Sequence, residues 1–332
     1  MSSSDLGHSD RNLALELVPV TEAAALAAAT MVGKGDKIAA DQAAVDAMHI
    51  VLKTVRMDGV VVIGEGEKDE APMLHNGEHI GDGSDPQVDI AVDPLEGTTL
   101  TAHGMPNALA VIALSPRGTM FDPGPCYYME KMAGGPELVG VLDLDKSLTE
   151  NLGNLADAKK KDIRDIVAIV LDRPRHEEGI EEIRAAGGSV RLITDGDVAA
   201  AMLAASENAP VDLLWGIGGT PEGVIAAAAL KCLGGGMIAR LYPRSDEERE
   251  AAIAGGYDLE SQLTQDDLVK GEDCFFSATG VTDGDVLQGV RYRGRGASTE
   301  SLVTRSRTGT IRRIHARHNR DKLREYEAER HS

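Results

Sequence analysis

The stretch Asp93-Pro94-Leu95-Glu96-Gly97-Thr98-Thr99 governs the interpretation of the whole sequence. It follows the largely apolar run from Val88 to Val92, which predicts a buried strand. Because proline cannot continue a central ladder, we expect the strand to stop and turn at Asp93-Pro94. Two carboxylates, three residues apart, thus come directly after a core strand.

A second acidic loop has the same design. The run Val60-Val61-Val62-Ile63 predicts another buried strand, and it ends in Gly64-Glu65-Gly66-Glu67-Lys68-Asp69-Glu70. Loops at the ends of adjacent strands open on one edge of a sheet, where α/β proteins bind ligands. Mg²⁺ and Mn²⁺ prefer oxygen ligands, so Glu65, Asp93, Glu96 and the Leu95 carbonyl predict a metal site. The competing interpretation is that each acidic loop is simply solvated.

Length and composition favour a layered α/β protein. With 332 residues the chain exceeds the size at which one core usually keeps growing, which predicts two domains. Apolar residues make up 42% but aromatic residues only 3%, so Ala, Val, Ile and Leu must fill the core.

The charge is strongly negative and unevenly distributed. The net charge of −20 argues against nucleic acid or an anionic membrane as the main partner. Residues 291–332 carry twelve Lys or Arg and five Asp or Glu, so the acidic charge is concentrated in the preceding 290 residues. A phosphate substrate would therefore need metal ions or local arginines.

Cysteine usage and the N-terminus predict a soluble, cytoplasmic protein. Cys126, Cys232 and Cys274 are odd in number and far apart, so neither a disulfide framework nor a zinc site is indicated. Residues 1–10 are polar and do not resemble a signal peptide, and we expect them to be disordered. No apolar run reaches the roughly 18 residues of a membrane span.

Periodicity outlines the remaining elements. Thr21 is expected to cap a helix that ends near Met31, and a second helix is expected to begin near Asp41 and extend to about 55. Further strands are predicted at 108–114, near Tyr127, and at 166–171, 190–194, 211–215 and 273–278. Helices at 176–186, 197–206 and 221–233 alternate with the later strands, which predicts a mainly parallel sheet. We place a domain boundary near residue 150.

The motifs resemble those of a known family. The stretch from Asp93 to Thr99 looks like the signature of the lithium-sensitive, metal-dependent phosphatases, and Glu96 narrows the match because inositol phosphatases usually have Asp there. Together the motifs resemble class II fructose-1,6-bisphosphatase over about residues 12–318. The others are Gly35-Asp36-Lys37, Gly64-Glu65-Gly66-Glu67, Asp69-Glu70-Ala71-Pro72-Met73-Leu74, Met129-Glu130-Lys131, Arg173-Pro174-Arg175-His176, Asp195-Gly196-Asp197 and Gly218-Gly219-Thr220-Pro221-Glu222-Gly223.

The resemblance implies roles for individual residues. The implied metal ligands, for Mg²⁺ or Mn²⁺, are Asp41, Glu65, Asp93, Leu95, Glu96 and Glu222. The implied catalytic residues are Thr98, which assists the nucleophilic water, with Glu65 and Asp93. The implied substrate contacts are Glu96, Gly97, Thr98, Tyr128, Arg173, Pro174, Arg175, Asp195, Gly196, Asp197 and Gly219.

Several of these residues also have an ordinary structural interpretation. Arg173 and Arg175 suit a phosphate that is not cleaved, but they also suit a surface ion pair. Asp195-Gly196-Asp197 suits sugar hydroxyls, yet it is also common turn and cap chemistry. Glu222 is expected at the second position of a helix capped by Thr220, where an acid complements the helix dipole.

Histidines and the C-terminal segment carry weaker signals. His49 is expected to be a packed or surface side chain, whereas His176 has no preferred interpretation. The arginines of the C-terminal segment are expected to form a solvated face rather than a phosphate or subunit site. They include Arg312, Arg313, Arg317 and Arg320.

The resemblance implies a layered α-β-α-β-α sandwich with the active site between two domains. These are an N-terminal metal-binding α/β domain (residues 11–150) and a C-terminal α/β domain (151–332), which contributes substrate contacts and the basic segment. The implied assembly is a homo-oligomer, a dimer or tetramer.

The implied activity is hydrolysis of the 1-phosphate of fructose 1,6-bisphosphate, a step of gluconeogenesis. Sedoheptulose 1,7-bisphosphate is an open alternative, alone or as a second substrate. Inositol monophosphate is a less suitable substrate, because it has no second phosphate for Arg173 and Arg175 to bind. A nucleotide-binding dehydrogenase belongs to a different class of protein. The run Gly216-Ile217-Gly218-Gly219 supports it weakly, because it lacks the third glycine of the dinucleotide-binding motif. A non-enzymatic acidic metal-binding protein remains as a remote alternative.

Overall fold

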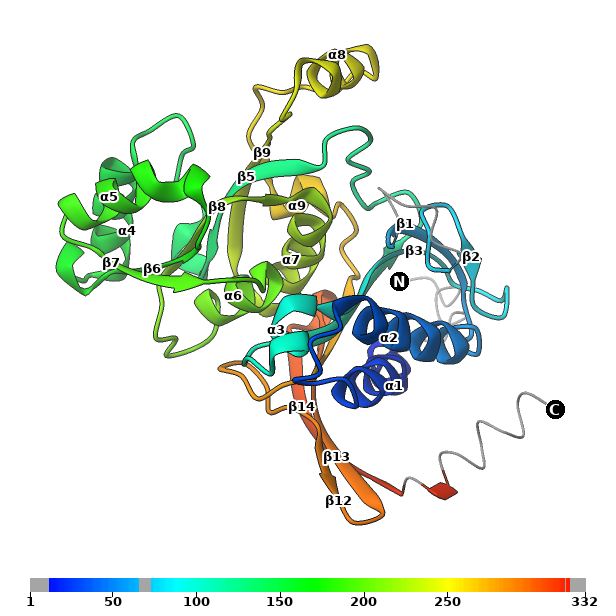
Figure 1. The fold of residues 1–332 in the computed structure, drawn as a ribbon. Helices are drawn as coiled ribbons and strands as arrows, with labels where there is room; N and C mark the ends of the chain where they lie inside the picture. The colour runs from blue at the N-terminus through cyan, green and yellow to red at the C-terminus, as the bar shows by residue number, and fades with distance from the viewer. Residues whose placement is uncertain (1–11, 66–72, 320, 323–332) are drawn as a thin grey trace, which may run out of the picture.

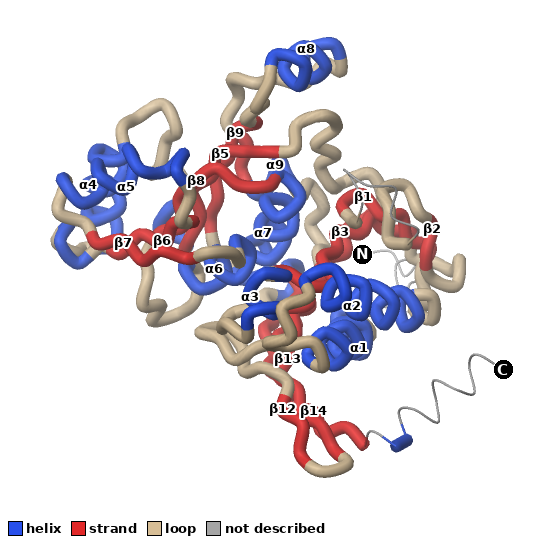
Figure 2. Tube along the Cα trace, viewed as in Figure 1, coloured by secondary structure: helices blue, strands red, loops and turns tan. Residues whose placement is uncertain are grey.

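The computed structural model describes residues 12–65, 73–319 and 321–322, so the predictions for residues 1–10 and for Arg320 lie outside the described residues. In the described part, two β-sheets are interleaved with helices (Figure 1), and helix and strand alternate along much of the chain (Figure 2). This agrees with the predicted mixed α/β class.

The first sheet has eight strands in the order β12-β13-β11-β4-β3-β1-β2, with β14 paired to β13. They are β1 (Asp58–Ile63), β2 (His79–Ile80), β3 (Gln87–Glu96), β4 (Leu109–Pro116), β11 (Phe275–Gly280), β12 (Arg291–Arg293), β13 (Gly296–Arg305) and β14 (Thr310–Asn319). Strands β1 and β3 are adjacent and parallel, whereas the other pairs are antiparallel.

The second sheet has six strands in the order β10-β9-β5-β8-β6-β7. They are β5 (Tyr128–Gly134), β6 (Val167–Leu171), β7 (Ser189–Ile193), β8 (Leu213–Gly219), β9 (Gly236–Leu241) and β10 (Leu263–Thr264). Strand β6 is parallel to β7 and β8, and the remaining pairs are antiparallel. The expectation of a mainly parallel sheet was therefore wrong, because β5, β9 and β10 complete the second sheet antiparallel, and β11 (predicted as 273–278) belongs to the first sheet.

The helices form three layers around the sheets. Helices α1 (Val18–Ala29) and α2 (Lys37–Leu52) share a core with one face of the first sheet. Helices α6 (Asp197–Ala204) and α7 (Thr220–Leu233) share a second core with strands of both sheets. Helices α4 (Leu148–Lys159) and α5 (Glu177–Ala185) share a third core with the second sheet. Smaller helices are α3 (Thr98–His103), α8 (Asp246–Ala254), which projects from the body, and α9 (Gln265–Leu268) (Figure 1).

The middle layer explains the low aromatic content. Every residue of α6 is buried, and so are ten residues of α7, among them the run from Ala226 to Ala229. A helix that is apolar all round belongs in an interior, and alanines allow two sheets to pack closely on either side of it.

The chain does not fill the two sheets in sequence order. Strand β5 lies in the second sheet although it precedes residue 150, and β11 to β14 return to the first sheet after residue 270. The predicted boundary near residue 150 therefore does not coincide with the division between the sheets.

Helix starts differ from the sequence patterns. Helix α1 begins at Val18 with a proline in its first turn, so Thr21 lies inside the helix and not at its cap. The buried Thr21 hydroxyl instead receives a 2.7 Å hydrogen bond from Thr279 of β11. Helix α2 is capped by Asp36, whose side chain accepts from the Ala39 amide, and this places Asp41 one turn further along than expected.

The C-terminal segment was predicted only as a basic region. It forms the long antiparallel pair β13 and β14, in which the exposed arginines of β14 include Arg312, Arg313 and Arg317. Among the described helices, none combines the length and apolar character that a membrane span requires.

Candidate active site

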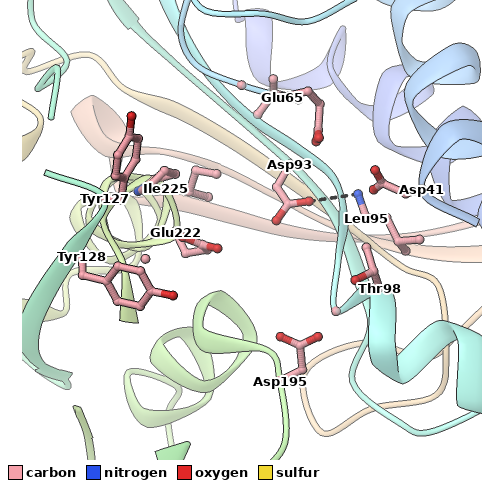
Figure 3. Close-up of a pocket in the computed structure, with 15 residues that line it drawn as sticks. Asp41, Glu65, Asp93, Leu95, Thr98, Tyr127, Tyr128, Asp195, Glu222 and Ile225 are labelled. Atoms are coloured by element: carbon pink, nitrogen blue, oxygen red, sulfur yellow. Dashed lines mark hydrogen bonds between the residues drawn. The ribbon is translucent and has the colours of Figure 1, made fainter. Parts of the chain in front are cut away.

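A cavity of about 380 Å³ lies between elements of the two sheets (Figure 3). One wall comes from the first sheet and its helices, and the opposite wall comes from β5, the end of β8 and the start of α7. The lining residues are Asp41, Gly64, Glu65, Val92, Asp93, Leu95, Gly97, Thr98, Tyr127, Tyr128, Asp195, Gly219, Pro221, Glu222 and Ile225.

The parallel pair β1 and β3 brings the two acidic loops together. Glu65 follows β1, and Asp93 lies near the end of β3, so both occupy the same edge of the first sheet. The Glu65 backbone is held by a 2.8 Å hydrogen bond from its amide to the Leu74 carbonyl. Residues 66–72, which include Glu67, Asp69 and Glu70, lie outside the described part.

The expected stop at Asp93-Pro94 was wrong in an informative way. Strand β3 continues through Pro94 to Glu96, and its register against β4 shifts between Asp93 and Glu96. A bulge tolerates proline because it leaves ladder positions unpaired. The Leu95 amide turns back to donate a 3.0 Å hydrogen bond to Asp93 Oδ1 (Figure 3). Gly97, at φ 89°, then starts α3 and presents Thr98 to the cavity.

Glu96 points beneath the cavity toward the second sheet. Its side chain is 3% exposed, and its Oε1 accepts a 3.0 Å hydrogen bond from the Val198 amide of α6. Its Oε2 is buried without a hydrogen-bond partner. An unpaired buried carboxylate oxygen is costly, and a bound cation would relieve that cost.

The carboxylates of the cavity raise one another's pKa. Burial, together with the charges of Asp41 and Glu222, raises the pKa of Glu65 to about 7. Burial and the neighbouring carboxylates, Glu65 first, raise the pKa of Asp93 well above its usual range. Burial likewise raises the pKa of Asp41 and of Glu222. Burial and neighbouring like charges both disfavour the ionised form of a carboxyl group, which explains the direction of these shifts.

The oxygen-rich donor set fits a hard divalent cation in its chemistry. The carboxylates of Asp41, Glu65, Asp93 and Glu222 border one space (Figure 3). Among the described residues, however, no three His, Cys, Asp or Glu side chains are already gathered into a group that could hold a metal ion.

The opposite wall carries its own cation, which the sequence had shown only as part of a motif. Lys131 of β5 is 1% exposed, and its Nζ lies 2.6 Å from Asp197 Oδ2 at the start of α6. It also donates a 3.3 Å hydrogen bond to the Gly219 carbonyl. Helix α7 begins with Thr220 after Gly219, so Glu222 is its third residue and not the second, as predicted.

Two guanidinium groups flank Tyr128. The Arg175 guanidinium carbon is 5.4 Å from the centre of the Tyr128 ring, and that of Arg244 is 4.5 Å from it. Arg175 also donates to the Ile217 carbonyl, and Arg173 donates to the Thr194 carbonyl just before Asp195. No sequence motif indicated Arg244. Its side chain reaches Tyr128 because β9, which precedes it, pairs with β5, which begins at Tyr128.

The two histidines prove to be packed side chains. His49 is buried, and its Nε2 lies 2.7 Å from Glu78 Oε1, which confirms its predicted packing. His176 is fully buried, where its Nε2 accepts from the Ile217 amide at 2.8 Å and its Nδ1 lies 2.8 Å from the Leu171 carbonyl. Burial lowers the pKa of His176. It therefore supports the Arg175 turn and not the cavity.

The structure gathers most of the predicted site residues around one cavity. Those that line it are Asp41, Glu65, Asp93, Leu95, Gly97, Thr98, Tyr128, Asp195, Gly219 and Glu222. Those that do not line it are Glu96, Arg173, Pro174, Arg175, Gly196 and Asp197. Tyr127, the neighbour of Tyr128 in the sequence, also lines the cavity.

Comparison with known proteins assigns the family. Residues 11–318 match the model of the family described as bacterial fructose-1,6-bisphosphatase, glpX-encoded. The chain belongs to this family. It is 46% identical over 327 residues to the fructose-1,6-bisphosphatase class 2 of Haemophilus influenzae, an alignment that covers 95% of this chain and 98% of the relative. It is 44% identical over 325 residues to fructose-1,6-bisphosphatase 1 class 2 of Escherichia coli K12, an alignment that covers 94% of this chain and 96% of the relative. The family match includes every residue of the cavity, from Asp41 to Ile225.

Proposed function

We propose that this protein is a cytoplasmic, metal-dependent phosphatase that converts fructose 1,6-bisphosphate to fructose 6-phosphate and inorganic phosphate in gluconeogenesis. The observation that carries the proposal is one cavity with a wall of mutually repelling carboxylates opposite a wall that bears arginines. Relatives named as fructose-1,6-bisphosphatases, which align over almost the whole chain, support the choice of substrate.

The carboxylate wall would hold Mg²⁺ or Mn²⁺. The ligands in this proposal are the carboxylates of Asp41, Glu65, Asp93, Glu96 and Glu222 with the Leu95 carbonyl. Bound ions of this kind neutralise phosphoryl oxygens, activate water and stabilise the leaving alkoxide. Glu222 reaches the cavity from α7, so the ion site would draw ligands from both walls.

Thr98 would orient the attacking water. It lines the cavity beside Asp93 and Leu95, on the first turn of α3 (Figure 3). Its hydroxyl can donate to or accept from a water molecule, and the Glu65 and Asp93 carboxylates can accept the proton that this water loses. No covalent phosphoenzyme is required.

The second wall would hold the sugar and the phosphate that is not cleaved. Guanidinium groups form paired hydrogen bonds with phosphate oxygens, so Arg173 and Arg175 suit this phosphate, with Arg244 extending the same wall beside Tyr128. Asp195 and Asp197 offer acceptors for sugar hydroxyls. The further proposed contacts are Glu96, Gly97, Pro174, Gly196 and Gly219.

A substrate panel tests this proposal. Phosphate release is measured from fructose 1,6-bisphosphate, sedoheptulose 1,7-bisphosphate and inositol 1-phosphate, each with Mg²⁺, with Mn²⁺ and with a chelator. We expect metal-dependent release from fructose 1,6-bisphosphate and little from inositol 1-phosphate, because a single phosphate leaves the arginine wall without a partner. Faster release from the seven-carbon sugar would reassign the substrate, and metal binding without release from any substrate would favour the non-enzymatic alternative.

A further inference from the structure

Lys131 is among the largest fully buried side chains in the described part of the chain. It lies in β5, in the middle of the second sheet, with Gly216 of β8 and Ala239 of β9 as its neighbours in the ladder. A lysine is rarely buried completely unless its charge is paired. Its position next to the cavity therefore needs an explanation.

The Lys131 ammonium group connects three elements. It forms the 2.6 Å ion pair with Asp197, the first residue of α6, and donates at 3.3 Å to the carbonyl of Gly219, the last residue of β8. Gly219 also caps α7, which carries Glu222. One charge in β5 thus holds the start of α6 and the start of α7.

Two glycines leave the space for this arrangement. A Cβ atom at Gly218 would clash with Asp197 Oδ2 and lie 3.1 Å from Lys131 Nζ. A Cβ atom at Gly219 would clash with the Glu222 carboxylate. The ion pair and the Glu222 carboxylate therefore pack directly against the backbone of the same turn, between β8 and α7.

We propose that Lys131 is a positioning residue that fixes Asp197 on the sugar side and Glu222 on the metal side of the cavity as one rigid unit. The roles of Asp197 and Glu222 rest on the proposed function, whereas the contacts of Lys131 do not. A buried ion pair that served stability alone could be replaced by a neutral pair without moving the Glu222 carboxylate. Loss of the Lys131 charge by itself would favour a bound cation, so weaker Mn²⁺ binding in the variants would point to displaced ligands.

The variants Lys131→Met, Asp197→Asn and their combination separate positioning from stability. In the double variant neither charge is left buried and unpaired, so it is expected to fold even where Lys131→Met does not. Lys159→Met, alone and combined with Lys161→Met, is the control, because both lysines pair with a buried aspartate, Asp212, at 3.3 and 2.6 Å, in the α4 layer away from the cavity.

Three quantities are measured below the melting temperature of each variant: kcat, KM for fructose 1,6-bisphosphate and the half-saturating Mn²⁺ concentration. The fourth is the melting-temperature shift caused by Mn²⁺ alone, taken from full melting curves. We expect Asp197→Asn to raise mainly KM. Lys131→Met and the double variant should raise both KM and the half-saturating Mn²⁺ concentration by about tenfold, with a smaller effect on kcat. Lys159→Met should leave all four within about twofold of the wild type.

The outcomes distinguish this inference from the proposed function. Equal half-saturating Mn²⁺ concentrations in the double variant and in Asp197→Asn would overturn it, because Lys131 would then have no effect on Glu222. A wild type that hydrolyses no sugar bisphosphate, but whose Mn²⁺ shift shrinks in the double variant, would refute the function and support the positioning role.

Discussion

The two walls of the cavity differ in whether their buried carboxylates form ion pairs. On the first wall, Asp41, Glu65 and Asp93 form no ion pair with any lysine or arginine among the described residues, and their pKa values rise. On the second wall, Asp197 is neutralised by Lys131. The first wall thus gathers buried carboxylates without a cationic side chain among them, whereas the second wall combines the Lys131–Asp197 ion pair with the buried carboxylate of Glu222.

Of the variants that distinguish the two walls, Asp93→Asn should cause the largest loss of activity. We expect phosphate release to fall by about 10³-fold, on the scale of a lost group that stabilises the transition state. In a chelator the same variant should melt at a higher temperature than the wild type, because a buried and repelled carboxylate has been removed. Activity assays with Mn²⁺ and melting curves in a chelator measure the two effects.

Asp89→Asn is the control from the same strand. Asp89 is 2% exposed, but its Oδ2 accepts from the amides of Thr119 at 2.8 Å and Met120 at 3.1 Å. Loss of a satisfied carboxylate should lower the melting temperature. Near-normal activity of Asp93→Asn, or a loss of stability like that of Asp89→Asn, would contradict the metal assignment.

In the absence of metal, the stability of the protein should depend on pH through the carboxylates of the first wall. The folded-state pKa of Glu65, about 7, lies above the ordinary glutamate pKa of 4.5, so the folded state binds the proton more tightly than the unfolded chain does. This contribution to stability is complete below about pH 4.5 and is lost as the pH rises through 7. The metal-free protein should therefore lose roughly 5 °C of melting temperature between pH 5 and pH 8.

The variant Glu65→Gln should flatten this profile, and Mn²⁺ should raise the melting temperature more at pH 8 than at pH 5, because cations compete with protons for the carboxylates. A stability that rises steadily from pH 5 to pH 8 in a chelator would show that the first wall is not built from repelling carboxylates.

The sequence predicted the first wall better than the second. Periodicity and the position of Glu65 and Asp93 after two apolar strands were enough to bring them to one sheet edge, because that placement depends on local patterns and one parallel pair. The roles of Lys131 and Arg244 depend on β5 pairing with β8 and β9, contacts distant in sequence that no local pattern encodes. The same limit explains the strand pairing of β11, β13 and β14, whereas Pro94 was misjudged because a bulge and a strand end have the same composition.

The arginines test the second wall. Arg175→Ala should raise KM for the bisphosphate by about tenfold with little change in kcat, because a group bound equally in ground and transition states affects affinity. Arg244→Ala should have a smaller effect of the same kind, about threefold, since the Arg175 guanidinium is oriented by two hydrogen bonds to the Ile217 carbonyl, whereas that of Arg244 lies over the Tyr128 ring. Arg164→Ala is the control, because Arg164 is exposed and pairs only locally with Asp162. A fall in kcat with unchanged KM would contradict this assignment.

A substitution far from both walls should have the smallest effect on stability and on the kinetic constants. Arg317 is exposed on β14, and Arg317→Ala should change the free energy of unfolding by less than about 0.5 kcal/mol. Its kinetic constants should stay within about twofold of the wild type, as a solvated face requires. A large change in KM or in sedimentation would instead place a phosphate or subunit contact on this strand.

The most direct test of the account is metal add-back to protein stripped by a chelator, with phosphate release from fructose 1,6-bisphosphate followed as Mn²⁺ or Mg²⁺ is titrated in. The account predicts no release without metal, recovery that saturates with added metal, and no recovery in Asp93→Asn. Full activity in the stripped protein would contradict it, because the carboxylate wall would then have no need of a cation.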